Sequence, residues 1–140
     1  MKHWSLAAAA VSLVAACAAP PPPPRPLPHV NAFGVHVAAE HSGSSITLER
    51  DRALEVRLGM SVAENREWEL VDFAPGVLTG AAAPRFEREQ RAANYNEAAG
   101  AAVWHFKATA AGTVMLKFEY RNPRTIAPAS RTVNYTVVVP

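Results

Sequence analysis

The sequence predicts an all-β domain, an antiparallel β-sandwich of seven or eight strands. From residue 31 to the C-terminus, short runs alternate apolar and polar residues, which is typical of strands with one buried face. Turn-forming residues separate these runs at short intervals, and no segment has a convincing helical period. Alternation does not determine whether the sheets close on themselves, so a β-barrel is kept as an alternative.

The clearest signal lies in residues 101–120, AAVWHFKATAAGTVMLKFEY. One run alternates around Trp104 and Phe106, a second alternates around Leu116 and Phe118, and a short Gly-containing connection lies between them. This pattern predicts a β-hairpin. Because an isolated hairpin is only marginally stable in water, we expect a second sheet to cover its apolar face.

The other strands are expected, in chain order, within residues 33–38, 46–49, 54–58, 68–73 and 132–139. Residues 59–67 are expected to form a polar loop, and residues 90–100 another. Between them Leu78 and Phe86 fit strands, and Pro84 favours an edge position because proline has no N–H to donate to a neighbouring strand. The predicted core consists of Leu54, Val56, Leu58, Trp68, Leu70, Phe106, Val114, Leu116, Phe118, Val133, Tyr135 and Val137.

Composition narrows the classes of function. The chain has 140 residues, which suits one domain, and its formal net charge is only +2. No predicted face carries a run of basic residues, so we expect no nucleic-acid partner. Cys17 is the only cysteine, which excludes a disulfide within the chain. We expect the protein to be a monomer.

The amino terminus resembles the leader of a bacterial lipoprotein. A short basic start precedes an apolar run over residues 4–16, which is too short to span a bilayer and fits a signal peptide. The run ends in LVAAC at residues 13–17, which resembles a lipobox, whose cysteine is lipidated after the peptide before it is cut. We therefore expect a signal peptide at residues 1–16 and a lipid anchor on Cys17 that holds the protein at a membrane. An ordinary signal peptide with a chance cysteine is the alternative.

A proline-rich tether is expected to join this anchor to the domain. Residues 17–30 hold the lipidated cysteine and the sequence PPPPPRPLP, and the sandwich is expected to occupy residues 31–140. Such a segment favours extended polyproline II structure of about 3 Å per residue, which suits a spacer. The residue after Cys17 is Ala18 and not Asp, and an Asp at this position would resemble a signal for the inner membrane. By resemblance to Gram-negative lipoproteins, we therefore expect the protein in the cell envelope, at the outer membrane, facing the periplasm or the cell surface.

No catalytic constellation is present in the sequence. The motifs GxSxG, HExxH and the P-loop are absent. His105 has no second His or carboxylate at metal-ligand spacing, so we expect no metal site. Glu64, Glu67 and Glu69 form an acidic cluster that a solvated surface explains better than paired acid and base catalysis. We therefore expect neither an enzyme nor a bound cofactor.

Four segments carry a resemblance to the chagasin family of cysteine-peptidase inhibitors. They are LEVRL at residues 54–58, Trp68, VWHFKATAAGTVMLKFEY at residues 103–120 and RTVNYTVVV at residues 131–139. The resemblance implies an immunoglobulin-like sandwich. It also implies that the partner is a papain-like cysteine peptidase, whose cleft is blocked by three loops at one end of the fold without covalent chemistry.

The three loops of the family correspond to residues 61–67, 94–100 and 121–125. In the first, Asn65 stands where the family has glycine, and Asn is the non-glycine residue that best tolerates left-handed backbone. Glu64 stands where the family has Thr, and a catalytic thiolate would repel this carboxylate unless a cation faces it.

The second and third loops keep less of the family's motifs. The second, Gly-x-Gly-Gly in the family, retains its last glycine, and the third, Arg-Pro-aromatic, retains its proline while an arginine replaces the aromatic residue. The resemblance implies these candidate inhibitory residues: Ala63, Glu64, Asn65, Arg66, Ala98, Ala99, Gly100, Arg121, Asn122, Pro123 and Arg124.

Two main hypotheses follow from the altered loops. In the first, the chain is a membrane-anchored inhibitor of papain-like peptidases. In the second, it is an envelope lipoprotein that keeps the scaffold as an interaction or structural module and does not inhibit. A domain that binds a small ligand is a third alternative, and it would need a pocket.

Overall fold

The computed structural model describes residues 19–32, 34–89 and 99–140. Within them lie ten strands and two 3₁₀ helices: β1 (His29–Val30), β2 (Gly34–Ala38), η1 (Ala39–His41), β3 (Ser44–Thr47), β4 (Ala53–Ser61), η2 (Val62–Glu64), β5 (Glu67–Asp72), β6 (Leu78–Gly80), β7 (Arg85–Arg88), β8 (Ala99–Ala108), β9 (Gly112–Arg121) and β10 (Arg131–Val139). The predicted signal peptide, Cys17 and Ala98 lie outside the described residues.

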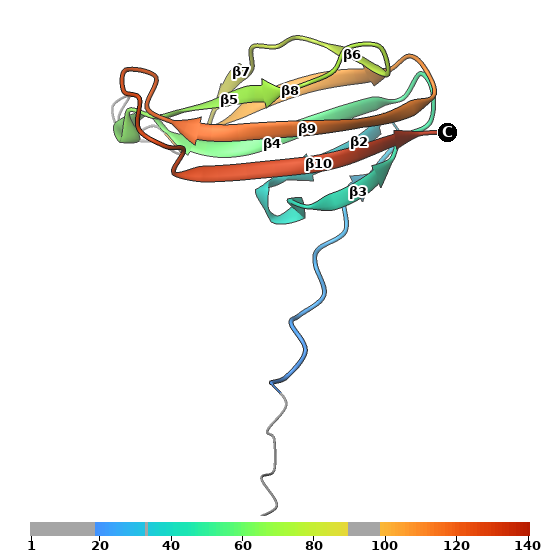
Figure 1. Ribbon diagram of the computed structural model, residues 1–140, viewed down its shortest axis with the longest axis horizontal. Helices are drawn as coiled ribbons and strands as arrows, with labels where there is room; N and C mark the ends of the chain where they lie inside the picture. The colour runs from blue at the N-terminus through green and yellow to red at the C-terminus, as the bar shows by residue number, and fades with distance from the viewer. Residues whose placement is uncertain (1–18, 33, 90–98) are drawn as a thin grey trace, which may run out of the picture.

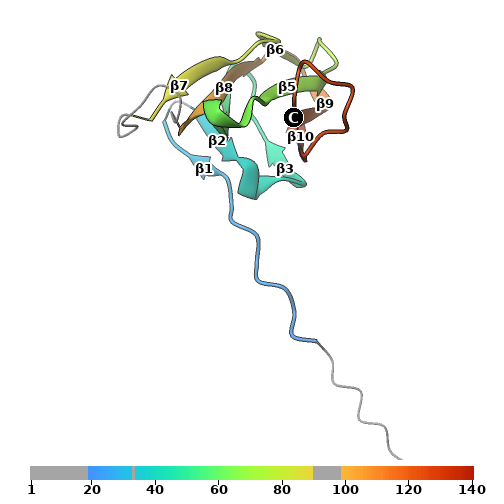
Figure 2. The same cartoon turned by 90° about the vertical axis from the view of Figure 1, so that its left-hand side faces the viewer.

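The strands form two sheets that pack face to face, which confirms the predicted all-β sandwich (Figures 1 and 2). One sheet has the order β1-β2-β4-β8-β6, with β7 also paired to β8, and the other has the order β3-β10-β9-β5. β6 and β7 contain Leu78 and Phe86, which the sequence also placed in strands, whereas β1 was not predicted, because two residues are too short to show alternation.

Two pairings are parallel, although the sequence predicts an antiparallel sandwich. β2 runs parallel to β4, and β3 runs parallel to β10. Parallel neighbours need a long crossover between them. β3 lies in the opposite sheet and forms part of the crossover from β2 to β4, so the chain returns to the first sheet in its original direction.

The predicted hairpin over residues 101–120 is wrong, because its two strands lie in different sheets. β8 pairs with β4, β6 and β7, whereas β9 pairs with β5 and β10. The chain changes sheets after Ala108, where the N–H of Thr109 donates to the Val77 carbonyl at 2.9 Å. Gly112, with a φ of 147°, then begins β9 in a backbone conformation that other residues avoid. The apolar faces of the two strands therefore meet across the core.

The core between the sheets contains almost all of the residues that the sequence predicts. The exception is Leu70, which is only partly buried at the edge of the core. Alternation also placed Trp104 on the apolar face of β8, and this side chain is among the largest of the fully buried ones. The Trp104 ring lies 4.8 Å from the Phe118 ring, centroid to centroid, and so joins the two sheets directly.

The end of the tether is attached to the side of the sandwich. His41 is buried, its Nδ1 accepts the N–H of Ala38 at 2.9 Å, and its Nε2 lies 3.0 Å from the Leu27 carbonyl. Because Nδ1 is an acceptor, Nε2 carries the ring proton and donates it to Leu27. β1 starts at His29, within the range predicted for the tether, and residues 19–28 leave the sandwich crosswise to the strands (Figure 1).

We expect Phe118→Ala to lower the free energy of unfolding by about 3 to 5 kcal/mol, because it leaves a cavity between Trp104 and Tyr135. Urea unfolding, followed by tryptophan fluorescence, measures this change. Met115→Ala on the same strand is the control, since Met115 is 52% exposed and its loss should cost less than about 0.5 kcal/mol. Equal losses in the two variants would contradict the role of Phe118 as a contact between the sheets.

Candidate functional site

Strand register brings the first and third predicted loops, together with the described end of the second, to one end of the sandwich. Ser61, at the end of β4, pairs with Ala99, where β8 begins. Glu67, at the start of β5, pairs with Arg121, where β9 ends. The first loop therefore starts beside the end of the second loop and finishes beside the start of the third. Figure 2 turns this end of the molecule, which we call the loop end, toward the viewer.

The first loop is a short 3₁₀ turn closed by Asn65. η2 is followed by Asn65 with a φ of 50°, and the Asn65 N–H donates to the Val62 carbonyl at 3.3 Å. This confirms the expectation that Asn replaces glycine at a left-handed position. The side chains of Ala63, Glu64, Asn65 and Arg66 are exposed, so the loop presents mostly polar groups.

The described part of the second loop is strand rather than loop. Ala99 and Gly100 belong to β8, and Gly100 pairs with both Met60 and Arg88. A Cβ on Gly100 would lie 2.5 Å from the Glu87 carbonyl oxygen, so glycine allows β7 to approach β8 closely. Arg57 pairs with Glu87 across the sheet and holds the pKa of that carboxyl below its usual value.

The third loop leaves β9 through a turn built on Asn122. The Asn122 side-chain oxygen accepts a hydrogen bond from the N–H of Arg124 at 2.9 Å. The Asn122 backbone carbonyl accepts one from the N–H of Thr125 at 3.3 Å. Pro123 and Arg124 are exposed at this turn, while Arg121 is half-buried at the end of β9. This Asx turn explains how the short segment keeps its shape without a core of its own.

A stacked cluster supports the first loop from below, and the sequence alone did not reveal it. The Arg131 guanidinium lies 4.3 Å from the Tyr120 ring centroid and 5.3 Å from that of Trp68. Its Nη2 is also 4.0 Å from a carboxylate oxygen of Glu64. Register explains the cluster, since Arg131 and Trp68 pair with Tyr120 from opposite sides. The Trp68 indole N–H donates to the Gly59 carbonyl at 2.9 Å and fixes the ring.

The hydroxyl of Tyr120 is buried in this cluster without a hydrogen-bond partner among the described residues. Burial is the main cause that raises the pKa of Tyr120, and the neighbouring Glu64 carboxylate raises it further. Tyr135, in the middle of the core, differs because its hydroxyl donates to the Ala38 carbonyl at 2.7 Å. Burial also raises the pKa of Tyr135.

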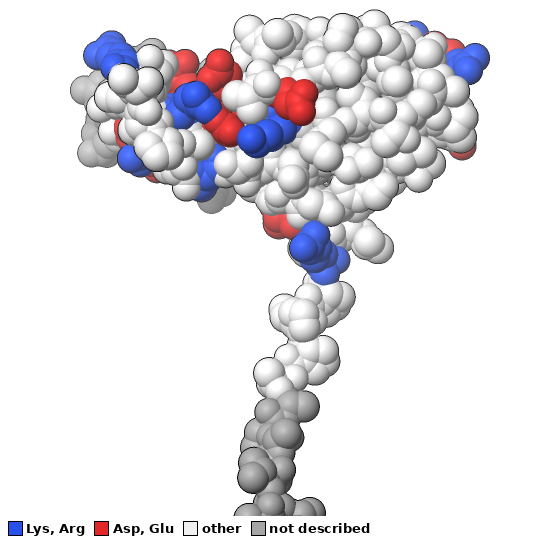
Figure 3. Space-filling model, viewed as in Figure 1, with Lys and Arg blue, Asp and Glu red and all other residues white. Residues whose placement is uncertain are grey.

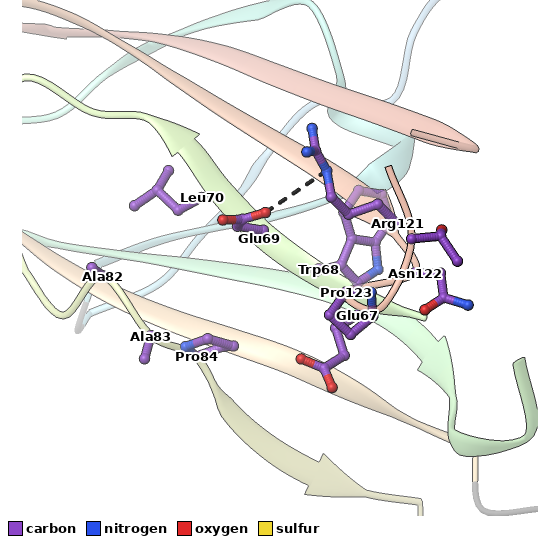
Figure 4. Close-up of a pocket in the computed structure, with 11 residues that line it drawn as sticks. Glu67, Trp68, Glu69, Leu70, Ala82, Ala83, Pro84, Arg121, Asn122 and Pro123 are labelled. Carbon is purple, nitrogen blue, oxygen red and sulfur yellow. Dashed lines mark ion pairs between the residues drawn. The ribbon is translucent and has the colours of Figure 1, made fainter. Parts of the chain in front are cut away.

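Two open grooves run along β5 at the loop end. The larger, of about 570 Å³, has the segment 82–84 on one side of β5 and the segment 121–123 on the other (Figure 4). The smaller, of about 370 Å³, is more apolar and is lined by side chains that include Met60, Val62 and Phe86. Both grooves share Trp68 in their walls, so the stacked cluster also shapes them.

Charged side chains gather near the loop end on the face shown in Figure 3. Arg121 bridges two carboxylates, with its Nε 3.7 Å from Glu69 and its Nη2 in contact with Glu119. Lys117 also pairs with Glu119 at 2.9 Å. Arg121 is therefore held over the outer face of β5 and β9, and it does not project beyond the loop end.

A row of titratable side chains crosses the outer face of the other sheet. Although no partner stands near His105 in the sequence, its Nε2 lies 3.2 Å from Glu55, and His36 Nδ1 lies 3.3 Å from the same carboxylate. Register brings them together on β2, β4 and β8. In the described part of the chain, no set of three or more His, Cys, Asp or Glu residues could hold a metal ion. No helix there is long and apolar enough to cross a membrane.

The comparisons with known proteins agree with this architecture. A model described as the chagasin family of peptidase inhibitors I42 matches residues 47–139. The structure of the cysteine protease inhibitor EhICP2 from Entamoeba histolytica is similar, with a TM-score of 0.66 and 12% identity over 75% of this chain and 94% of that one. The solution structure of amebosin has a TM-score of 0.61 and 19% identity over 75% and 96%. No curated protein sequence matches the chain.

Because the pKa values of the two buried tyrosines are raised, we expect the protein to lose stability at alkaline pH. A phenol whose pKa is raised in the folded state stabilises that state below its unfolded pKa of about 10, and the contribution is lost as the pH rises above this value. We expect the free energy of unfolding to fall above about pH 10, and to fall less steeply in Tyr120→Phe and Tyr135→Phe. Denaturant unfolding at pH 7 to 11 measures both effects.

The same two variants separate the hydroxyl groups at neutral pH. Tyr135→Phe should cost about 1 kcal/mol, since the Ala38 carbonyl loses its donor. Tyr120→Phe should be neutral or slightly stabilising, because the buried hydroxyl has no hydrogen-bond partner among the described residues to offset its loss of hydration. A larger loss for Tyr120→Phe than for Tyr135→Phe would contradict this description of the cluster.

Proposed function

The chain belongs to the chagasin family of peptidase inhibitors, and from this premise we propose that it inhibits papain-like cysteine peptidases. The observation that carries the proposal is the convergence of the first and third loops at one end of a rigid sandwich, beside the start of β8. In the proposed complex these loops enter the active-site cleft and shield the catalytic cysteine from substrate. Occlusion of the cleft needs only a stable and complementary surface, so the proposed inhibition requires no nucleophile or cofactor from this chain.

The pairing of Glu64 supports this role of the first loop. A bare carboxylate near a catalytic thiolate would be repelled, but Arg131 lies 4.0 Å from Glu64 and supplies an opposing charge from within the chain. Arg131 is in turn held by its stacking on Tyr120. The loop therefore meets the peptidase with its charge balanced and its shape already formed, which lowers the entropy lost on binding.

The lipid anchor and the tether define where the inhibitor acts. In the proposal, Cys17 is lipidated and holds the domain at the outer membrane, and the proline-rich segment spaces it from the lipid. The attachment of the tether supports this arrangement. Leu27 is held by His41 on the side of the sandwich, and the tether leaves there crosswise to the strands, away from the loop end (Figure 1). Target peptidases would then be those that enter the envelope or approach the cell surface.

We expect the purified chain to inhibit papain or a cathepsin L-type enzyme reversibly and with one-to-one stoichiometry. Asn65→Ala should raise the inhibition constant at least about tenfold, because alanine is strained at a φ of 50° and the first loop changes shape. Titration of residual peptidase activity with each variant measures the effect.

Asp51→Ala is the matched control for this experiment. Asp51 also has a positive φ, 66°, but it lies in the turn before β4, at the opposite end of the sandwich. Both variants should lose about 1 kcal/mol or more of stability, and only Asn65→Ala should lose inhibition. A folded chain that inhibits neither enzyme at micromolar concentration would count against the proposal and favour the interaction module that does not inhibit.

The anchor has a separate test. Expressed in a Gram-negative host, the chain should incorporate labelled fatty acid and sediment with outer membranes, whereas Cys17→Ser should do neither. The substitution removes only the thiol that would carry the lipid. Release of the unchanged chain into the soluble periplasmic fraction would show instead that an ordinary signal peptide had been cleaved.

A further inference from the structure

The third loop is held at both of its ends, and the side chains of residues 123–128 between them are exposed. At its start, the turn on Asn122 fixes the backbone from Asn122 to Thr125. At its end, both the backbone N–H and the hydroxyl of Ser130 donate to the Tyr120 carbonyl, at 2.8 and 3.0 Å. Pro123 and Pro128 restrict the backbone further. A loop held in this way loses little conformational entropy when it binds a partner.

Ile126 lies in the middle of this loop, and its side chain is fully exposed. Other large apolar side chains that are exposed lie on strands or on the tether, and all of them keep part of their surface covered. Single exposed apolar residues are common and need no explanation by themselves. Ile126 differs in its position, because it lies on a loop at the loop end, where the other exposed side chains of the described residues are polar or belong to alanine and proline.

Among the described residues, no other large apolar side chain at the loop end is fully exposed. Protein interfaces usually depend on a few large side chains that enter a pocket of the partner. In the third loop the aromatic residue expected from the family is replaced by Arg124, and in the first loop the exposed residues are small or polar. The apolar groove near Phe86 is concave and is lined in part by the first loop, so it could receive a side chain of a partner but cannot itself enter a partner's pocket.

We propose that Ile126 is the apolar anchor of the inhibitor and enters an aliphatic-binding subsite of the target peptidase. The inference rests on the proposed function and names the partner more closely: a papain-like peptidase with an apolar pocket within reach of the third loop. Burial of a β-branched side chain that is already held in place adds affinity at little entropic cost. The remaining residues of the loops then supply shape complementarity and polar contacts around Ile126.

The test compares four variants of the full chain against papain and a cathepsin L-type enzyme. Ile126→Ala should raise the inhibition constant about 10- to 100-fold, mainly through faster dissociation, because contacts buried in a complex act on the dissociation rate. Ile126→Asp should weaken inhibition more, and Ile126→Leu should stay within about threefold of the unchanged chain. Met115→Ala removes a comparable exposed side chain from the outer face of β9 and should change nothing.

The outcomes separate this inference from the proposed function. Thermal unfolding should be the same for all four variants, since neither position contributes to the core. If the unchanged chain inhibits and Ile126→Ala inhibits equally well, the anchor is overturned while the proposed function stands. If Ile126→Asp weakens inhibition and Ile126→Ala does not, the anchor is also overturned, because only the introduced charge then accounts for the effect. If the unchanged, folded chain inhibits neither enzyme, the proposed function and the anchor fail together.

Discussion

The structure depends on the packing of aromatic rings between the two sheets. Trp104 on β8 meets Phe118 on β9 at 4.8 Å, and Phe118 meets Tyr135 on β10 at 6.1 Å. Because β8 and β9 follow one another in the chain, this contact requires the chain to change sheets between them. Each strand then completes its hydrogen bonds with strands that are distant in sequence. The apolar faces of both sheets are buried against each other, which supplies the main driving force for folding.

The order of strands that results from this packing also builds the loop end. β4 and β8 bring the first loop beside the start of β8, and β5 and β9 bring it beside the third loop. The exposed side chains of the first and third loops cannot hold these loops by packing in the core, so the shape of both loops depends on groups supplied by the sandwich. Arg131, stacked on Tyr120 and paired with Glu64, links the framework to the first loop. Two hydrogen bonds from Ser130 do the same for the third loop.

The loop end illustrates how a binding surface can be kept separate from the core. Its exposed residues can change without opening a cavity, because the buried side chains of β5 and β9 already complete the packing beneath them. Altered loop motifs on a retained framework are therefore physically compatible with a stable fold. The ion pairs around Arg121 lie on the outer face of the sheet, where solvent screens them, so they add little to stability and mainly position side chains.

The sequence by itself determined the approximate position of the longer strands and which face of each is buried, since the period of two is a local property of the chain. It also indicated the left-handed position of Asn65 and the edge position of Pro84. It did not determine strand partners: the alternation around Trp104 and Phe118 is the same in a hairpin and in facing sheets. The stacking of Arg131, the row of His36, Glu55 and His105, and the close approach that requires Gly100 join residues far apart in the chain. Only the tertiary structure decided these, because register between distant strands depends on how the whole core packs.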